Sequence, residues 1–183
     1  MRMTRPGLLQ RLRAAWFRQQ WSCQTVEGTP QLAAPALLAD TGSIHFDAGV
    51  TLGWQSGQGC LSGYTYIEAR NRGSLVAFGT GTHLNNCVTA VSDGPGVTIG
   101  ERCVVGPGGH IYDSDSHALD ATIRLVAAHA MEAIRIADDV FIGSSAIVLK
   151  SVAVGAGNVI GRERWSPPMC LRSRPSATIQ RRS

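Results

Sequence analysis

Aliphatic residues recur at every sixth position over residues 136–165 of the 183-residue chain. Divided into blocks of six, this segment reads IADDVF, IGSSAI, VLKSVA, VGAGNV and IGRERW, and each block begins with Ile or Val. The same template fits the upstream blocks IGERCV and VGPGGH, and Phe78, Leu84 and Ala90 keep the spacing further back. A period of six matches neither an amphipathic helix nor a half-buried strand. It predicts a parallel β-helix built of hexapeptide repeats, which is an all-β fold.

The geometry of such a repeat explains its residue types. The leading aliphatic side chain of each block points into a prism, and successive coils stack about 4.8 Å apart as parallel strands. Glycine in the second position, as at Gly143 and Gly155, relieves the tight corner between two strands. Because each coil buries its apolar face only against neighbouring coils, the repeat has to continue to be stable. We therefore expect one β-helical domain over residues 23–161.

Residues 6–21 (PGLLQRLRAAWFRQQW) follow a helical period instead. Leu9, Leu12 and Trp16 fall on one stripe, with arginines between them. We expect a short basic amphipathic helix within an N-terminal segment, residues 1–22. Two roles stay open for it: a cap over one end of the domain, or a helix that lies in a membrane interface.

The six-residue phase breaks between Ile111 and Ile136, which are 25 residues apart. A loop covering about residues 112–135 must therefore leave the coil. Loops longer than about a dozen residues in a compact domain are usually functional or disordered. The loop carries these polar residues: Asp113, Asp115, His117, Asp120 and His129.

The net charge of +4 is distributed unevenly along the chain. Residues 1–22 hold five arginines and no acid, and residues 162–183 hold six arginines and one acid. The intervening residues 23–161 contain six bases and twelve acids and are therefore net negative. A nucleic-acid-binding protein concentrates positive charge on its folded surface, so this distribution argues against a nucleic-acid partner.

The five cysteines are widely spaced and form no C-x-x-C pair. This pattern argues against a disulfide framework or a zinc ribbon and fits a reducing compartment. No apolar run approaches the roughly 20 residues that a membrane-spanning helix needs. The predicted location is the cytoplasm, with peripheral contact at the inner membrane as a further possibility through the N-terminal helix.

Four segments together resemble the hexapeptide-repeat acyltransferases, which have a left-handed β-helix. They are Asn85-Asn86, VTIGERCVVGPG (97–108), IYDSDSHALD (111–120) and IRIADDVFIGSSAIVLKSVAVGAGNVIG (134–161). The sequence is most similar to the maltose/galactoside acetyltransferase group and the polysaccharide O-acetyltransferases. The resemblance implies an acetyl-CoA-dependent O-acetyltransferase, with acetyl-CoA as co-substrate and no metal. It also implies a sugar or polysaccharide acceptor and a homotrimer with active sites between subunits.

The resemblance also implies roles for individual residues. His117 stands at the position of the family's general base, and an imidazole is suited to take a proton from an alcohol near neutral pH. Asp113 and Asp115 would orient this imidazole or hold sugar hydroxyls. Asn85 or Asn86 would contact the acceptor, although the pair could instead form a stacked asparagine turn at a corner.

On the coenzyme side, Gly143, Ser144 and Gly161 match the positions along which CoA lies in the family. Ser151 departs from the pattern because the family usually has glycine there. After Gly161 the family pattern is lost, and residues 162–183 are expected to be an irregular tail, which a shift of reading frame in GC-rich codons could have produced. An inactive scaffold without its CoA-binding end therefore stays open as an alternative.

A zinc hydratase on the same fold is a further alternative. It requires histidines from adjacent coils that converge on one metal ion. His110 and His117 are seven residues apart, and the H-x4-H spacing that such enzymes share is missing. The sequence therefore favours acyl transfer over metal-dependent hydration.

Overall fold

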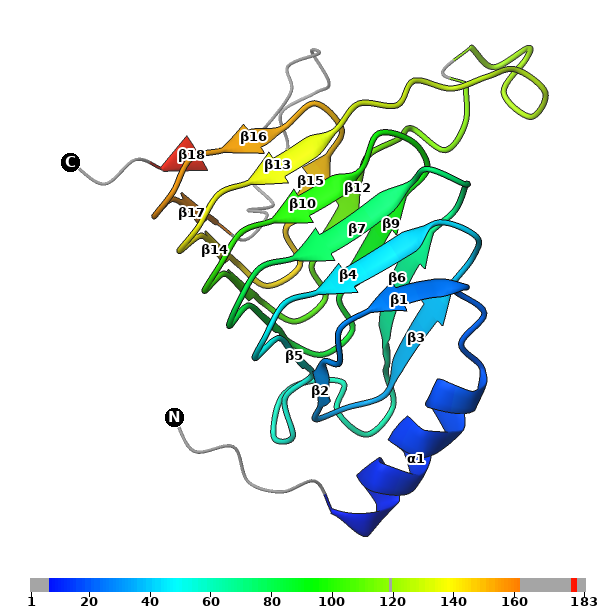
Figure 1. Cartoon of the computed structure of the whole chain (residues 1–183). Helices are drawn as coiled ribbons and strands as arrows, with labels where there is room; N and C mark the ends of the chain where they lie inside the picture. The colour runs from blue at the N-terminus through cyan, green and yellow to red at the C-terminus, as the bar shows by residue number, and fades with distance from the viewer. Residues whose placement is uncertain (1–6, 119, 162–178, 181–183) are drawn as a thin grey trace, which may run out of the picture.

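The computed structural model describes residues 7–118, 120–161 and 179–180, which form a three-sided prism of parallel strands after one short helix (Figure 1). The first sheet contains β1 (Thr25–Glu27), β4 (Ser43–Phe46), β7 (Leu75–Phe78), β10 (Val97–Ile99), β13 (Ile134–Ile136) and β16 (Ala153–Val154). The second contains β2 (Gln31–Leu32), β5 (Thr51–Leu52), β8 (His83–Leu84), β11 (Val104–Val105), β14 (Phe141–Ile142), β17 (Val159–Ile160) and β18 (Ile179–Gln180). The third contains β3 (Ala36–Ala39), β6 (Thr65–Ala69), β9 (Thr89–Ser92), β12 (His110–Tyr112) and β15 (Ile147–Leu149).

From β1 to β17 the chain visits the three sheets in strict rotation, so each full coil contributes one strand to each sheet. Strands of successive coils pair in parallel throughout β1 to β17, as β7, β10 and β13 do in the first sheet. This arrangement is the left-handed parallel β-helix that the six-residue period predicts. The fold prediction is therefore confirmed.

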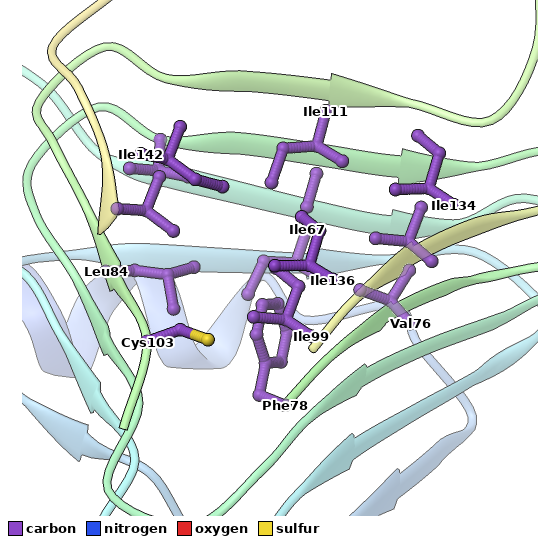
Figure 2. Close-up of a cluster of buried hydrophobic side chains, with 14 of the residues drawn as sticks. Ile67, Val76, Phe78, Leu84, Ile99, Cys103, Ile111, Ile134, Ile136 and Ile142 are labelled. Carbon is purple, nitrogen blue, oxygen red and sulfur yellow. The ribbon is translucent and has the colours of Figure 1, made fainter. Parts of the chain in front are cut away.

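The core is a set of stacked ladders of apolar side chains inside the prism (Figure 2). Register places Phe78, Ile99 and Ile136 above one another in the first sheet. A second ladder runs from Leu84 through Val105 to Ile142 in the second sheet. Ladder members are buried because a leading aliphatic at every sixth position returns to the same inward orientation in each sheet.

Corners between sheets bring the backbones of neighbouring coils close together. A Cβ atom at Gly106 would lie 2.6 Å from the backbone nitrogen of Ser144 in the next coil. The Gly143 N–H donates to the carbonyl oxygen of Ile160 at 2.8 Å, one coil further on. Glycine at such a corner permits coil-to-coil hydrogen bonding that a side chain would obstruct.

The N-terminal helix α1 (Leu8–Gln19) lies against β3 at the end of the prism that the first coil forms (Figure 1). The segment is helical as predicted, but the helix turns a polar side toward the domain and its apolar side away from it. Gln10 is buried, and the side chains of Gln10 and Arg13 both donate to the carbonyl oxygen of Cys60. Leu9 and Leu12, in contrast, are exposed. Among the described residues, no helix is long and apolar enough to cross a membrane.

Two segments interrupt the coils. Residues 53–64 form an insertion between β5 and β6, and residues 113–133 form the predicted loop between β12 and β13 (Figure 1). The predicted tail, residues 162–183, lies outside the described residues except for β18. Ile179 and Gln180 form β18, which pairs antiparallel with β17. The exposed edge of the last coil presents unpaired backbone groups, which explains why a short strand adds there.

Candidate functional site

The predicted site residues lie at two different corners of the prism. Asn85, Asn86, Gly143 and Ser144 lie at the corner between the second and third sheets, which we name the asparagine corner. The chain leaves the third sheet after β12 and returns to the first sheet at β13, and His117 projects from this second corner, which we name the loop corner. The third sheet separates the two corners.

Asn86 is a buried clamp for the insertion of residues 53–64. Its Oδ1 accepts from the backbone N–H of Trp54 at 2.8 Å, and its Nδ2 donates to the carbonyl oxygen of Trp54 at 2.7 Å. Because both ends of the amide are occupied and the side chain is 1% exposed, Asn86 is held as a structural residue. Asn85 is half-buried, and its Oδ1 accepts from the backbone N–H of Asn86 at 2.8 Å.

A pair of rings, Trp54 and His83, lies near the asparagine corner, and sequence reasoning did not identify it. The rings of Trp54 and His83 meet edge to face with centroids 5.5 Å apart. Burial lowers the pKa of His83, so this imidazole is neutral at pH 7. Trp54 lies in the insertion, outside the six-residue period, and only the clamp by Asn86 reveals that it belongs to this corner.

Asp113 is fully buried at the base of the loop. Its carboxylate accepts hydrogen bonds from Ser92 Oγ (2.8 Å) and from the backbone N–H groups of Asp93 (2.7 Å), Gly94 (3.3 Å) and Gly96 (3.0 Å). These four donors occupy the carboxylate and close the turn of the preceding coil. This geometry favours a structural role for Asp113 over contact with a sugar or an imidazole.

The two arms of the loop pair with each other just beyond Asp113. Ser114 and Met131 form an antiparallel bridge, and the Asp115 N–H donates to the carbonyl oxygen of Ala130 at 3.1 Å. The Asp115 carboxylate forms an ion pair with Lys150 Nζ at 3.1 Å. These contacts fix the neck of the loop against the next coil, so the residues beyond the neck project from a rigid base.

His117 is exposed in the first bend beyond this neck. The preceding residue, Ser116, has a φ of 59°, which turns the chain sharply. Within the described part of the chain, no hydrogen bond or ion pair holds the imidazole ring of His117. The exposed imidazole is therefore available to an incoming group.

A second loop histidine, His129, belongs to a partly buried charge network that the sequence did not reveal. Its Nε2 lies 2.7 Å from Oδ2 of Asp93, and Arg70 Nη1 donates to the same oxygen at 3.1 Å. Arg70 is itself held by two hydrogen bonds of 3.0 Å to the carboxylate of Glu68. Burial raises the pKa of Asp93, but the hydrogen bond from His129 and the positive charge of Arg70 outweigh it and lower this pKa. The network ties the returning arm of the loop to the coil.

The coenzyme positions that the resemblance implies lie at the asparagine corner, directly after β14 and β17. Gly143 is buried, Ser144 is half-buried, and Gly161 is exposed at the end of the described coils. Ser151 adopts a φ of 70°, the left-handed region in which glycine is favoured, and this agrees with the glycine expected there. Among the described residues, no group of three or more His, Cys, Asp or Glu side chains gathers as a metal site would require.

Comparison with known proteins gives one similar relative. The chain is 33% identical over 89 residues to a galactoside O-acetyltransferase of Lactococcus lactis, which covers 49% of this chain and 42% of the relative. This chain thus spans less than half the length of the relative that it matches. No model of a known protein family and no solved structure matches the chain. The similarity and the three parallel sheets are together consistent with a hexapeptide-repeat acetyltransferase.

Proposed function

We propose that this protein is an O-acetyltransferase that moves an acetyl group from acetyl-CoA to a hydroxyl of a sugar or polysaccharide. The observation that carries the proposal is the rigid loop that presents His117 from a β-helix similar to a galactoside O-acetyltransferase. The fold alone would not suffice, because one fold hosts many activities. The loop adds a histidine whose imidazole is exposed.

In the proposed reaction, His117 acts as general base. A ring nitrogen takes the proton of the acceptor hydroxyl while the hydroxyl oxygen attacks the acetyl carbonyl carbon. The new C–O bond forms as the C–S bond of the thioester breaks, and the proton passes from the imidazolium to the departing sulfur. Backbone N–H groups of a neighbouring coil are the donors that would stabilise the charge developing on the carbonyl oxygen.

We assign the acceptor to the asparagine corner, where Asn85 offers an amide and Trp54 an aromatic ring. Apolar and aromatic walls with a few placed polar groups are typical of small-molecule sites. The half-buried Ser144 and the Gly143 backbone lie at the same corner, two coils above Asn85, where the resemblance implies CoA. Asp115 would act indirectly, by holding the neck of the loop through Lys150.

This assignment requires more than one subunit. The strands of the third sheet are three to five residues long, so its two corners are roughly 10–17 Å apart at about 3.3 Å per residue. A general base must come within about 3 Å of the proton that it takes. We therefore propose a homotrimer in which the loop corner of one subunit meets the asparagine corner of the next, because a cyclic three-fold ring pairs two different surfaces.

Exposed apolar side chains beside the asparagine corner support this assembly. Val104 and Phe141 point outward from the second sheet, and Ile147 and Leu149 point outward from the third. They flank the corner on both sides, and register places Phe141 directly beside Val104. A neighbouring subunit would remove this contiguous apolar surface from water.

The test is a thiol-release assay with acetyl-CoA and a panel of galactosides and polysaccharides, with the acetylated product identified by mass spectrometry. We expect His117→Ala to lower the turnover rate by about 10² to 10⁴-fold while the melting temperature stays unchanged. His45→Gln, which changes a histidine on the first sheet, is the matched control and should keep full activity. Equal turnover in His117→Ala would refute the assignment of the base, and absence of thiol release from the unaltered protein would favour an inactive scaffold.

A further inference from the structure

The N-terminal helix turns its apolar side away from the domain. Leu8, Leu9, Leu12 and Trp16 are 72%, 63%, 60% and 58% exposed, although a helix on a protein surface normally buries its apolar stripe. At 3.6 residues per turn, these four residues fall within an arc of roughly 100° on the side opposite Gln10. The helix thus presents a continuous apolar stripe to its surroundings.

Polar contacts hold the helix in this orientation. Arg13 donates to the carbonyl oxygens of Cys60 (2.9 Å) and Gly63 (3.1 Å), and Gln10 also donates to Cys60. The ring of Phe17 packs against Tyr64 with centroids 4.9 Å apart. These contacts join the inward side of the helix to the insertion of residues 53–64, so the stripe is fixed outward by specific partners.

The charge around the stripe points to its occupant. Residues 1–22 hold five arginines and no acidic residue, whereas residues 23–161 are net negative. Arg11 and Arg18 are exposed and lie along one flank of the stripe. A second copy that packed helix against helix would bring like charges together, whereas an anionic lipid surface is complementary to this helix.

We propose that α1 docks the protein on an anionic lipid surface, with Leu9, Leu12 and Trp16 in the boundary between headgroups and acyl chains. Leucine and tryptophan on one face and arginine beside them are characteristic of helices that lie in the plane of a membrane interface. A free helix of twelve residues would be marginal in water. Here the contacts with residues 53–64 keep it folded, so binding does not have to pay for folding the helix.

This proposal is independent of the proposed acetyl transfer, and its test does not measure that activity. The whole protein is sedimented with vesicles of phosphatidylcholine alone and with vesicles in which part of the lipid is phosphatidylglycerol. We expect binding to the anionic vesicles only, and release by high salt because salt screens surface charges. Arg11→Gln with Arg18→Gln should weaken binding by about fivefold for each arginine removed.

The stripe variant replaces Leu9, Leu12 and Trp16 with glutamine, and we expect it to weaken binding at least about tenfold. Since these side chains are exposed, its melting temperature should match that of the unaltered protein. The matched control replaces Leu125 and Val126, each 86% exposed in the loop, with glutamine, and should bind as the unaltered protein does.

Three results would overturn the proposal. The first is unaltered protein that stays in the supernatant with both kinds of vesicle. The second is equal loss of binding in the stripe variant and the loop control. The third is a change of molar mass in the stripe variant by light scattering without lipid, which would make the stripe an interface between copies of this chain.

Discussion

Replacing Asp113 with alanine tests whether the base of the loop is structural or catalytic. The carboxylate is fully buried and accepts from one hydroxyl and three backbone N–H groups. Alanine leaves these donors without their acceptor. A buried donor without a partner costs about 1–3 kcal/mol, and here four neutral donors lose one shared acceptor, with partial relaxation limiting the sum.

We therefore expect Asp113→Ala to lower the free energy of unfolding by about 3–5 kcal/mol. For a domain of this size, 1 kcal/mol corresponds to about 2–4 °C, so the melting temperature should fall by about 6–20 °C. Asp113→Asn keeps the volume and one acceptor oxygen, and should lose about half as much. The measurement is thermal unfolding followed by circular dichroism.

Asp115→Asn is the matched control, because Asp115 lies two residues away in the same arm and forms one partly exposed ion pair with Lys150. Such a pair contributes at most about 1 kcal/mol, so its loss should lower the melting temperature by only a few degrees. The reasoning is refuted if Asp113→Ala melts like the unaltered protein yet loses turnover. That result would favour the role that the resemblance implies for Asp113, which is to hold sugar hydroxyls or to orient the imidazole.

Two further predictions concern stability. Ser151 has a left-handed φ of 70°, so Ser151→Gly should raise the free energy of unfolding by up to about 1 kcal/mol, measured by urea denaturation; an unchanged or lower midpoint would contradict the strain. Hydrogen bonds to Asp47 and Glu27 raise the pKa of His45. The stability that these hydrogen bonds contribute is fully present below pH 6.5, the ordinary histidine pKa, and is lost as pH rises through the pKa of His45 in the folded protein. The melting temperature should therefore fall more between pH 6 and pH 8 in the unaltered protein than in His45→Gln. Parallel curves for the two proteins would show that the contacts of His45 with Asp47 and Glu27 contribute nothing to stability.

The coils could be predicted from the sequence because each inward position requires a buried apolar side chain. Ile99, Ile111, Ile136 and Ile142 are buried as the six-residue period requires. The period also located the loop, because residues that do not fit the six-residue repeat have to leave the coil. It did not reveal the first two coils fully, because the insertion of residues 53–64 separates β5 from β6 and destroys the phase there.

The orientation of α1 could not be predicted, for a different reason. Helical periodicity reports that an apolar stripe exists, but the direction in which it points depends on contacts far away in the sequence. Gln10 and Arg13 bind carbonyl oxygens about fifty residues later, in a segment without periodicity. The default expectation of an apolar stripe against the domain therefore fails where polar contacts determine the docking.

In the candidate site, too, the sequence pattern locates residues but does not reveal their hydrogen-bond partners. Asn85 and Asn86 are adjacent in the sequence and equivalent as letters, yet only Asn86 is enclosed, because its side chain meets the backbone of Trp54. The resemblance to a family supplied His117 but could not distinguish a buried Asp113 from a solvent-accessible one. Hydrogen-bond partners make that distinction, and they depend on which corners stack.

His129 shows how the stacking of corners brings distant residues into one hydrogen-bonded network. Asp93 lies one coil below the neck of the loop, 36 residues from His129, and binds it at 2.7 Å. Because Arg70, one coil lower still, holds Asp93 from the other side, three successive coils converge on the returning arm of the loop. The departing arm is fixed at the same turn, because the carboxylate of Asp113 accepts from the backbone N–H of Asp93. A loop anchored at both arms has little freedom at its neck, so the position from which the loop presents its exposed histidine is determined by the prism.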